Sequence, residues 1–364
     1  MALRKPPLRE AHAERGATFT EFGGWDMPVE FDSIRAEHTA VREAAGIFDV
    51  SHMGQVEVTG PDSETLMQRL TSNDVSALAP GDAQYGVITD EDGIILDDTV
   101  TYCLPESHPA DYLFVPNAGH DEQMHRRWTT YRDDHGLDAV VENATDDTAM
   151  FAVQGPDAVD LAVDAFGGML RDLSRFEATL ATLREAECLV ARTGYTGEDG
   201  VEVVCPAGAA EAVYEAFDAA EPCGLGARDT LRIEAGLLLS GQDFDPDENP
   251  RTPYEAGLGW TVKLDTEFVG RDALEAVEAA GIDEKFVGFR LLDRGVPRHG
   301  YDIVNTDGTI VGEVTSGTMS PTLGEPIGMG YVPTQYADPG TVVRVVVRGQ
   351  QKRARVQPLP FLDQ

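Results

Sequence analysis

The first third of the chain mixes helical and strand-like spacing of apolar residues. Ser33 is typical of a helix N-cap, and the pattern after it predicts a helix to about Ala45. Two alternating segments, 84–89 and 94–102, flank Asp90–Gly93, a sequence typical of a tight turn. These two segments are therefore expected to form an antiparallel hairpin.

The centre of the chain repeats this mixture. A polar helix is expected from His120 to Asp134, with Met124 and Trp128 on one side. Further strands are expected at 148–153, 176–183, 188–193 and 201–205, and further helices at 207–219 and 227–235. No regular strand–helix–strand period is visible, so the pattern favours an α+β fold with largely antiparallel sheets.

The last third changes character after a helix predicted at Arg271–Ala280. Strand then follows strand, with turns such as Thr306–Gly308 between them. The expected strands are 286–292, 309–316, 327–331, 341–347 and 353–357. This pattern predicts an all-β module, a sandwich or a barrel, that starts near residue 284.

Charge is the most unusual feature of the composition. The 364 residues include 64 acidic and 28 basic ones, a formal net charge of −36, which argues against a nucleic-acid-binding role. Hydrophobic residues make up 42% of the chain, so whole-chain disorder is excluded. At about 1 M salt the Debye length is about 3 Å, which screens such self-repulsion. We interpret the chain as a protein of a high-salt cytoplasm; the alternative is an acidic surface for a basic partner.

Membrane and metal roles find no support in the pattern. No apolar run approaches the ~20 residues that a membrane helix requires, and no secretory signal is visible, so a cytoplasmic location is expected. The four cysteines match neither a zinc ribbon nor a Cys-x-x-Cys pair, and buried free thiols are expected. His120 and His125 are five residues apart, which suits no helical metal pair, so no metal is expected.

Two adjacent acids inside an apolar strand are the first candidates for chemistry. Asp97 and Asp98 follow Gly93–Leu96, and neighbouring strand side chains point to opposite faces, so one carboxylate must face inward or into a cavity. A buried carboxylate is costly unless it is hydrogen-bonded. The pair either belongs to a sheet edge or salt bridge, or accepts a ligand N–H or ammonium group.

Two other segments carry polar groups in a distinctive pattern. The glycine-rich segment 192–200 either presents Glu198 to a planar, donor-rich heterocycle or is an ordinary acidic turn. Arg228 and Arg232 are four residues apart on a predicted helix. They form either a solvated salt-bridge set or a site for a ligand carboxylate or carbonyl.

Several separate strings together resemble one known family, the glycine cleavage system T-protein or aminomethyltransferase. Their order and spacing hold over nearly the whole chain, although the connection between Asp98 and Asn117 is longer here. The strings are Phe22–Pro28, Phe48–Gly54, Gly93–Asp98, Asn117–Gly119, Gln154–Pro156, Gly194–Glu198, Ala227–Asp229, Gly257–Trp260, Thr315–Gly317 and Pro360–Phe361.

The resemblance implies a three-domain, cloverleaf-like α+β arrangement around a tetrahydrofolate site. Residues 1–283 would form a folate-binding region of two intertwined α+β subdomains with antiparallel sheets. Residues 284–364 would form a C-terminal β-barrel or jelly-roll-like domain. The chain ends shortly after Pro360–Phe361 and lacks the longer tail of some relatives.

The resemblance also implies an activity and its residues. A T-protein moves a methylene unit from the aminomethyl-dihydrolipoyl arm of the lipoylated H-protein to tetrahydrofolate and releases ammonia. By resemblance, Asp98 is the catalytic carboxylate beside the folate N10, and Glu198 accepts hydrogen bonds from the pterin. The other family positions near the folate are Met53, Tyr85, Asn117, Tyr195, Arg228 and Trp260.

Two alternatives share the fold and the folate site. One is a tetrahydrofolate-dependent demethylase that acts on a small methylated donor, which the sequence does not separate from the leading interpretation. The other is a non-enzymatic folate-binding protein of iron–sulfur maintenance, which carries a reactive cysteine in a Lys-Gly-Cys-Tyr type motif. The corresponding stretch here, Lys263–Arg271, has no cysteine, which argues against that class.

Overall fold

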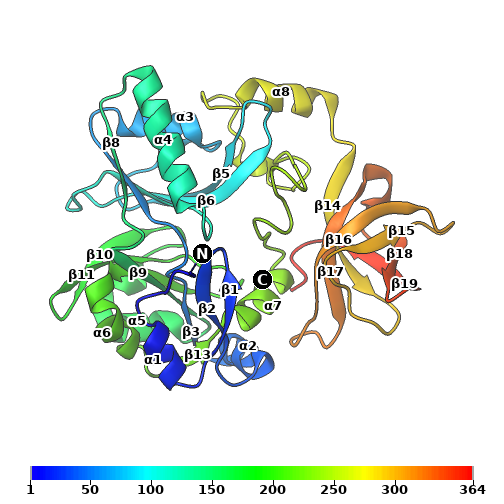
Figure 1. The fold of residues 1–364 in the computed structure, drawn as a ribbon, viewed down its shortest axis with the longest axis horizontal. Helices are drawn as coiled ribbons and strands as arrows, with labels where there is room; N and C mark the ends of the chain where they lie inside the picture. Colours follow the sequence, from blue (N-terminus) through cyan, green and yellow to red (C-terminus); the bar gives the residue numbers. More distant parts are fainter. Residues whose placement is uncertain (1, 363–364) are drawn as a thin grey trace.

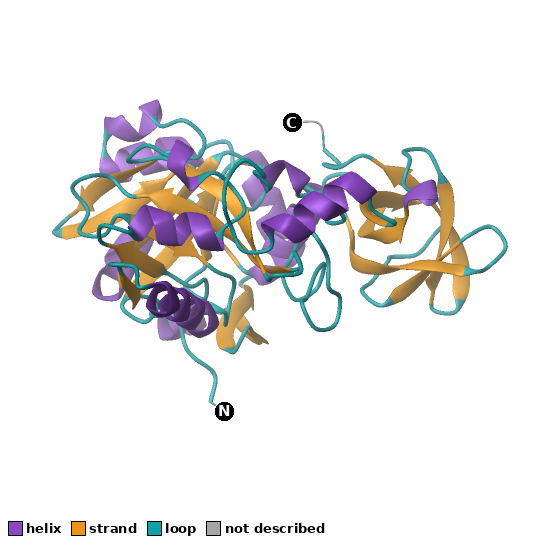
Figure 2. Cartoon of the chain, turned by 90° about the horizontal axis from the view of Figure 1, so that it is seen from above, coloured by secondary structure: helices purple, strands orange, loops and turns teal. Residues whose placement is uncertain are grey.

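The computed structural model describes residues 2–362, which form three bodies around a common centre (Figure 1). Two bodies combine helices with a sheet, and the third is a β-barrel that lies at one end of the molecule (Figure 2). The expected three-part α+β architecture with a C-terminal barrel is confirmed. Within the described residues, every helix is too short or too polar to cross a bilayer.

The first body is a five-stranded antiparallel sheet covered by two helices. Its strands, in spatial order, are β5 (Ala83–Thr89), β6 (Ile95–Cys103), β7 (Tyr112–Val115), β4 (Val56–Thr59) and β8 (Val140–Asn143). The helices are α3 (Ser63–Leu70) and α4 (Asp121–His135). Met124 and Trp128 of α4 are fully buried in the core between helices and sheet. The predicted hairpin is confirmed, with Val87 of β5 opposite Asp98 of β6.

The second body is a six-stranded sheet in which several neighbouring strands are far apart in the sequence. Its strands, in spatial order, are β10 (Ala178–Leu183), β11 (Ala186–Ala191), β12 (Gly200–Pro206), β9 (Thr148–Gln154), β3 (Gly46–Asp49) and β13 (Glu221–Cys223). All neighbours are antiparallel except β13 and β3. Its core is packed by α1 (Arg9–Glu14), α5 (Ala158–Phe166) and α6 (Ala210–Glu215).

A ribbon and two helices pack together at the β3–β13 edge of the second sheet. The ribbon consists of β1 (Thr18–Phe22) and β2 (Trp25–Glu30), and β2 packs against α7 (Leu225–Glu234). Helix α2 (Ile34–Glu43) packs on α7 as well. The Ser33 hydroxyl accepts a hydrogen bond from the Ala36 backbone N–H at 3.2 Å, which confirms the predicted N-cap.

The third body is a closed six-stranded barrel preceded by α8 (Arg271–Ala280). Around the barrel the strands are β14 (Glu284–Leu291), β17 (Pro326–Pro333), β16 (Ile310–Met319), β15 (Tyr301–Val304), β18 (Val342–Val347) and β19 (Gln350–Gln357). Short 3-10 helices elsewhere are η1 (Val75–Ala77), η2 (Gly168–Asp172), η3 (Ala207–Ala209), η4 (Gly259–Thr261) and η5 (Thr334–Tyr336). Five barrel strands match the predicted ones, and β15 was not predicted.

Helix α7 carries the charged contacts that hold the barrel against the other two bodies. The buried Arg232 guanidinium lies 2.7 Å from the Asp243 carboxylate and donates to the Ser316 hydroxyl of β16 at 2.8 Å. The buried Glu234 carboxylate accepts from Arg42 of α2 at 2.9 Å and from the hydroxyl of Thr322, after β16, at 2.9 Å. These contacts place the barrel beside the centre of the molecule.

Candidate active site

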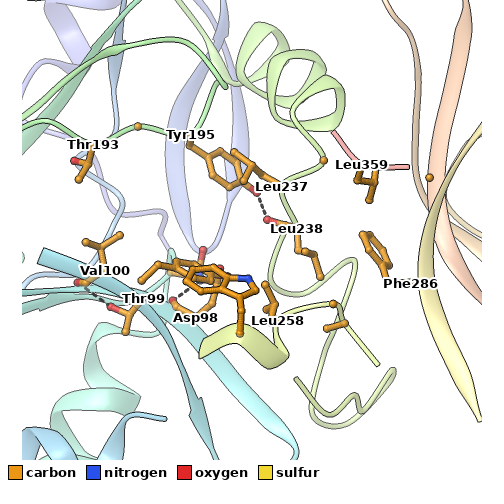
Figure 3. A pocket seen from close by; sticks show the side chains of 18 of the residues that line it. Asp98, Thr99, Val100, Thr193, Tyr195, Leu237, Leu238, Leu258, Phe286 and Leu359 are labelled. Atoms are coloured by element: carbon orange, nitrogen blue, oxygen red, sulfur yellow. Dashed lines mark hydrogen bonds between the residues drawn. The ribbon is translucent and has the colours of Figure 1, made fainter. Parts of the chain in front are cut away.

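A cavity of about 620 Å³ lies where the three bodies meet (Figure 3). The first body contributes β5 and β6, with Tyr85 and Asp98 on the cavity side. The segment before β12 and helix α7 contribute Tyr195 and Arg228. The barrel and the C-terminal segment contribute an apolar wall that includes Phe286. A cavity of this size, with few polar groups in apolar walls, is typical of a small-molecule site.

Strand alternation separates the two adjacent acids, as the sequence predicts. The Asp98 carboxylate faces the cavity, whereas Asp97 is fully buried on the opposite face of β6. Asp97 accepts hydrogen bonds from the Asn117 backbone N–H at 3.1 Å and from its side-chain amide at 2.7 Å. Both carboxylates therefore have functions other than a solvent-exposed salt bridge.

Two side chains hold the Asp98 carboxylate in place. The Tyr85 hydroxyl donates to Oδ2 at 2.7 Å, and the Asn117 amide donates to Oδ1 at 2.6 Å. Burial and, after it, the charge of Asp97 raise the pKa of Asp98 to about 6 overall, against the opposing effect of the two hydrogen bonds. The longer connection after β6 leaves Asn117 in contact with both acids.

Aromatic rings border the carboxylate. Tyr85 and Trp260 stack with ring centroids 5.8 Å apart and an angle of 24° between their planes. Trp260 lies on η4 and is 58% exposed, which is unusual for so large an apolar side chain. An exposed ring beside a cavity offers a stacking surface to a flat ligand.

The segment after β11 places a second aromatic group on the opposite wall. Gly194 has no room for a side chain, because a Cβ atom would lie 1.9 Å from the Gln154 amide oxygen. This close approach fixes Tyr195, whose hydroxyl donates to the Leu238 carbonyl. The Arg228 guanidinium lies 4.3 Å from the centroid of the Tyr195 ring. Met53 also lines the cavity.

Glu198 is the one predicted site residue that the structure places away from the cavity. Its carboxylate accepts from the Arg42 guanidinium at 2.8 Å. Glu202, four residues later on β12, lines the cavity instead and accepts from the Thr193 hydroxyl at 2.6 Å. Burial raises the pKa of Glu202, and Arg228 opposes the rise. The role expected of Glu198 stays a prediction, while Glu202 is the glutamate that lines the cavity.

The sequence around Glu202 carries a recognisable pattern. Glu202 is an acid inside the apolar strand Gly200–Pro206, the same pattern that singles out Asp97 and Asp98. The first part of the glycine-rich turn, with Gly194 and Tyr195, lines the cavity, whereas its Glu198 end lies against Arg42 of α2.

The two arginines of α7 have different environments. Arg228 faces the cavity, and no carboxylate among residues 2–362 lies within ion-pair distance of it. Burial lowers the pKa of Arg228. Arg232 is 1% exposed and pairs with Asp243 and Asp229, so it is part of the barrel contact. Arg232 is therefore a structural ion pair, and for Arg228 the ligand role stays a prediction.

The remaining cysteine and histidine residues form no metal centre in the part of the chain described. All four cysteines are free thiols, and three of them are buried. No group of three or more His, Cys, Asp or Glu side chains within residues 2–362 is arranged to hold a metal ion.

Two family models match the chain in sequence. The GCVT N-terminal domain matches residues 8–266, and the glycine cleavage T-protein C-terminal barrel domain matches residues 284–363. The second match covers the closed barrel described above. Together the two models span nearly all of the chain.

Individual relatives match over their full length. A probable aminomethyltransferase of Haloarcula marismortui is 61% identical over 363 residues, which is 100% of both chains. An aminomethyltransferase of Halothermothrix orenii is 43% identical over 99% of this chain and 100% of its own. The solved aminomethyltransferase T of the glycine cleavage system of Bartonella henselae superimposes with a TM-score of 0.92 at 33% identity, covering 100% of this chain and 99% of that one. The chain belongs to the glycine cleavage T-protein family of aminomethyltransferases.

Proposed function

We propose that this protein transfers the methylene unit of an aminomethyl group, carried by the dihydrolipoyl arm of the H-protein, to tetrahydrofolate and releases ammonia. Family membership supports an aminomethyltransferase, and the observation that carries the finer proposal is the position of Asp98. Its carboxylate is fixed by two hydrogen bonds at the wall of a cavity large enough for a pterin.

The residues around the cavity fit tetrahydrofolate. The exposed ring of Trp260, stacked on Tyr85, suits one face of a flat ring system. The Glu202 carboxylate suits the N–H donors at the edge of a pterin. Met53, Tyr195 and the other apolar lining suit the remainder of the ring. Bound tetrahydrofolate would supply the amine nitrogens that accept the one-carbon unit.

Asp98 would act through its negative charge. A fixed carboxylate orients the accepting N–H group and stabilises positive charge that develops while C–N bonds exchange. With a pKa of about 6, Asp98 is mainly ionised above neutral pH. The fixed partners Tyr85 and Asn117 hold the carboxylate in one orientation, so little reorganisation is needed during reaction.

Cations at the cavity complement an anionic substituent. Arg175, Arg228 and Lys285 line the cavity, and within the described residues none of them has a carboxylate within ion-pair distance. Arg175 and Lys285 are exposed, whereas Arg228 lies deeper. In a chain with a net charge of −36, unpaired cations at one site favour the carboxylates of a folate glutamyl tail as their ligand.

The test is a reconstituted assay in concentrated KCl. Lipoylated H-protein that carries the aminomethyl group is mixed with the enzyme and tetrahydrofolate, and methylenetetrahydrofolate and ammonia are measured. Formation of both, dependent on each component, supports the proposal. A parallel reaction replaces the H-protein with small methylated amines, because turnover there alone would identify a demethylase. Folate binding without turnover of any donor would indicate a non-enzymatic folate-binding protein.

A further inference from the structure

A continuous set of polar contacts runs from the cavity carboxylate to the start of α4. The Asn117 amide joins the two acids, at 2.6 Å from Asp98 and 2.7 Å from Asp97. On the far side of Asp97, the imidazole Nδ1 of His120 lies 3.1 Å from Oδ2. Asp98 is therefore connected, through Asn117 and Asp97, to a histidine that lies outside the cavity lining.

Asp97 needs a positive charge in this position. Its side chain is fully buried and is surrounded by dipolar donors, including the Asp98 backbone N–H at 3.0 Å. Two ionised carboxylates that share one amide repel each other, and a buried pair of this kind holds one proton unless a cation is near. Among residues 2–362, His120 is the only Lys, Arg or His side chain within 4 Å of Asp97.

The surroundings of His120 favour its protonated form. Asp97 contacts the ring from β6, and the charges of Asp98 and of Asp245, in the segment between α7 and α8, also raise the pKa of His120. The contact with Asp97 is the largest cause of a raised pKa of His120, and burial opposes the rise. The next residue, Asp121, is already paired with Arg4 at 2.9 Å. The His120 side chain is 30% exposed, so it can exchange protons with solvent.

We propose that His120 is a positioning residue, whose protonated imidazole offsets the charge of buried Asp97 and thereby keeps Asp98 available as an ionised acceptor near neutral pH. The catalytic consequence rests on the function proposed above, but the charge relation between the three side chains does not. His120 does not touch the cavity, so it acts only through Asp97 and Asn117.

A purely structural role for His120 would look different. The residue occupies the position before α4, yet its side chain makes no capping hydrogen bond there. The Nδ1 contact to Asp97, at 3.1 Å, also lacks the alignment of a good hydrogen bond, so a rigid structural hydrogen bond does not account for it. A structural role predicts an equal effect at every pH, whereas a charge effect is confined to the range in which His120 is protonated.

The sign of the effect follows from electrostatics. Removal of the imidazolium leaves the charge of Asp97 uncompensated, which makes ionisation of Asp98 harder. In His120→Gln the acid limb of the pH profile of kcat should therefore move to higher pH. The expected shift is about half a pH unit, because the imidazolium affects Asp98 only through Asp97. Above the pKa of His120 the ring is neutral in the parent protein too, so the two rates should converge there.

Two further variants sharpen the test. His125→Gln changes a histidine of the same helix whose ring contacts the Val141 carbonyl at 3.2 Å, and it should leave the profile unchanged. Asp97→Asn removes the repelling charge and should move the acid limb to lower pH. In the Asp97→Asn background, His120→Gln should add little, because the imidazole has lost the charge it offsets.

The deciding measurement does not depend on turnover. Aspartate labelled with ¹³C at its side-chain carboxyl is incorporated, and the Asp98 signal is identified by its loss in Asp98→Asn. An upward shift of its titration midpoint in His120→Gln, absent in His125→Gln, supports the proposal. An unchanged midpoint overturns it, even if the enzyme transfers aminomethyl groups normally. A shifted midpoint in a protein that lacks aminomethyl transfer would instead contradict only the function proposed above.

Discussion

The cavity has two walls of opposite character. The wall formed by β5, β6 and Asn117 holds a carboxylate, a phenol and an amide in a fixed hydrogen-bonded set. The wall formed by the barrel and the C-terminal segment is mostly apolar, with Phe286, Val287 and Leu359 on the cavity and the charge of Lys285 at its rim. Under the function proposed above, the sheet wall would perform the chemistry, and the barrel wall would enclose the ligand and exclude water.

The largest expected effect is on the sheet wall. Asp98→Asn keeps the size of the side chain but removes its charge, so kcat should fall by about a hundredfold to a thousandfold while folate binding stays measurable. Asp134→Asn, an exposed change on α4, is the matched control. Steady-state kinetics and isothermal titration with tetrahydrofolate measure the two quantities. Near-normal turnover of Asp98→Asn would remove the catalytic assignment.

The second prediction compares two glutamates of one chain segment. Glu202→Gln removes the charged acceptor on the cavity, and the Kd for tetrahydrofolate should rise about tenfold. Glu198→Gln changes an acid that pairs with Arg42 outside the cavity, so its Kd should stay close to that of the parent. Fluorescence titration of both variants with tetrahydrofolate shows which of the two glutamates contributes to binding. The reverse order of effects would restore Glu198 as the pterin acceptor.

The barrel wall should affect binding more than chemistry. Leu359→Ala removes apolar contact with a ligand, so KM for tetrahydrofolate should rise about fivefold with kcat nearly unchanged. Leu292→Ala, at an exposed position after β14, controls for general loss of apolar surface. A fall in kcat as large as that of Asp98→Asn would show that the two walls do not divide the work as described.

The smallest effect is expected at the rim. The double variant Arg175→Gln, Lys285→Gln should reduce the preference for diglutamyl over monoglutamyl tetrahydrofolate by about twofold, because exposed charge pairs contribute little and salt screens them. Arg355→Gln, an exposed barrel residue away from the cavity, is the control. An unchanged preference in competition assays would mean that the glutamyl tail is not held by these cations.

Local patterns in the sequence predicted much of the fold. The Asp90–Gly93 turn, the Ser33 N-cap and helix Arg271–Ala280 are encoded within a few residues, and the structure confirms each of them. Strands β1, β2, β8, β13 and β15 were not predicted. Strand β13 has three residues and pairs with β3, which is distant in sequence, and β15 has only four, so neither shows a clear local period.

The geometry of the site was predictable from the sequence only where the residues concerned are neighbours on one strand or in one turn. Strand alternation predicted that Asp97 and Asp98 face opposite sides, because that geometry is local. The contact between His120 and Asp97, and the choice between Glu198 and Glu202, depend on how separate elements meet. No spacing in one sequence shows which side of a glycine-rich turn lies against a helix.

Helix α7 has a consequence for how the protein accommodates its ligand. Arg228 faces the cavity, and one turn later Arg232 is bound to Asp243 and to the barrel. A translation or rotation of the helix that moved the Arg228 guanidinium would also separate Arg232 from the buried Asp243 carboxylate. Breaking a buried ion pair of this kind costs about 3–5 kcal/mol. The Arg228 guanidinium therefore has a fixed position. A ligand that requires this cation an ångström or two away must change its own conformation or will not bind.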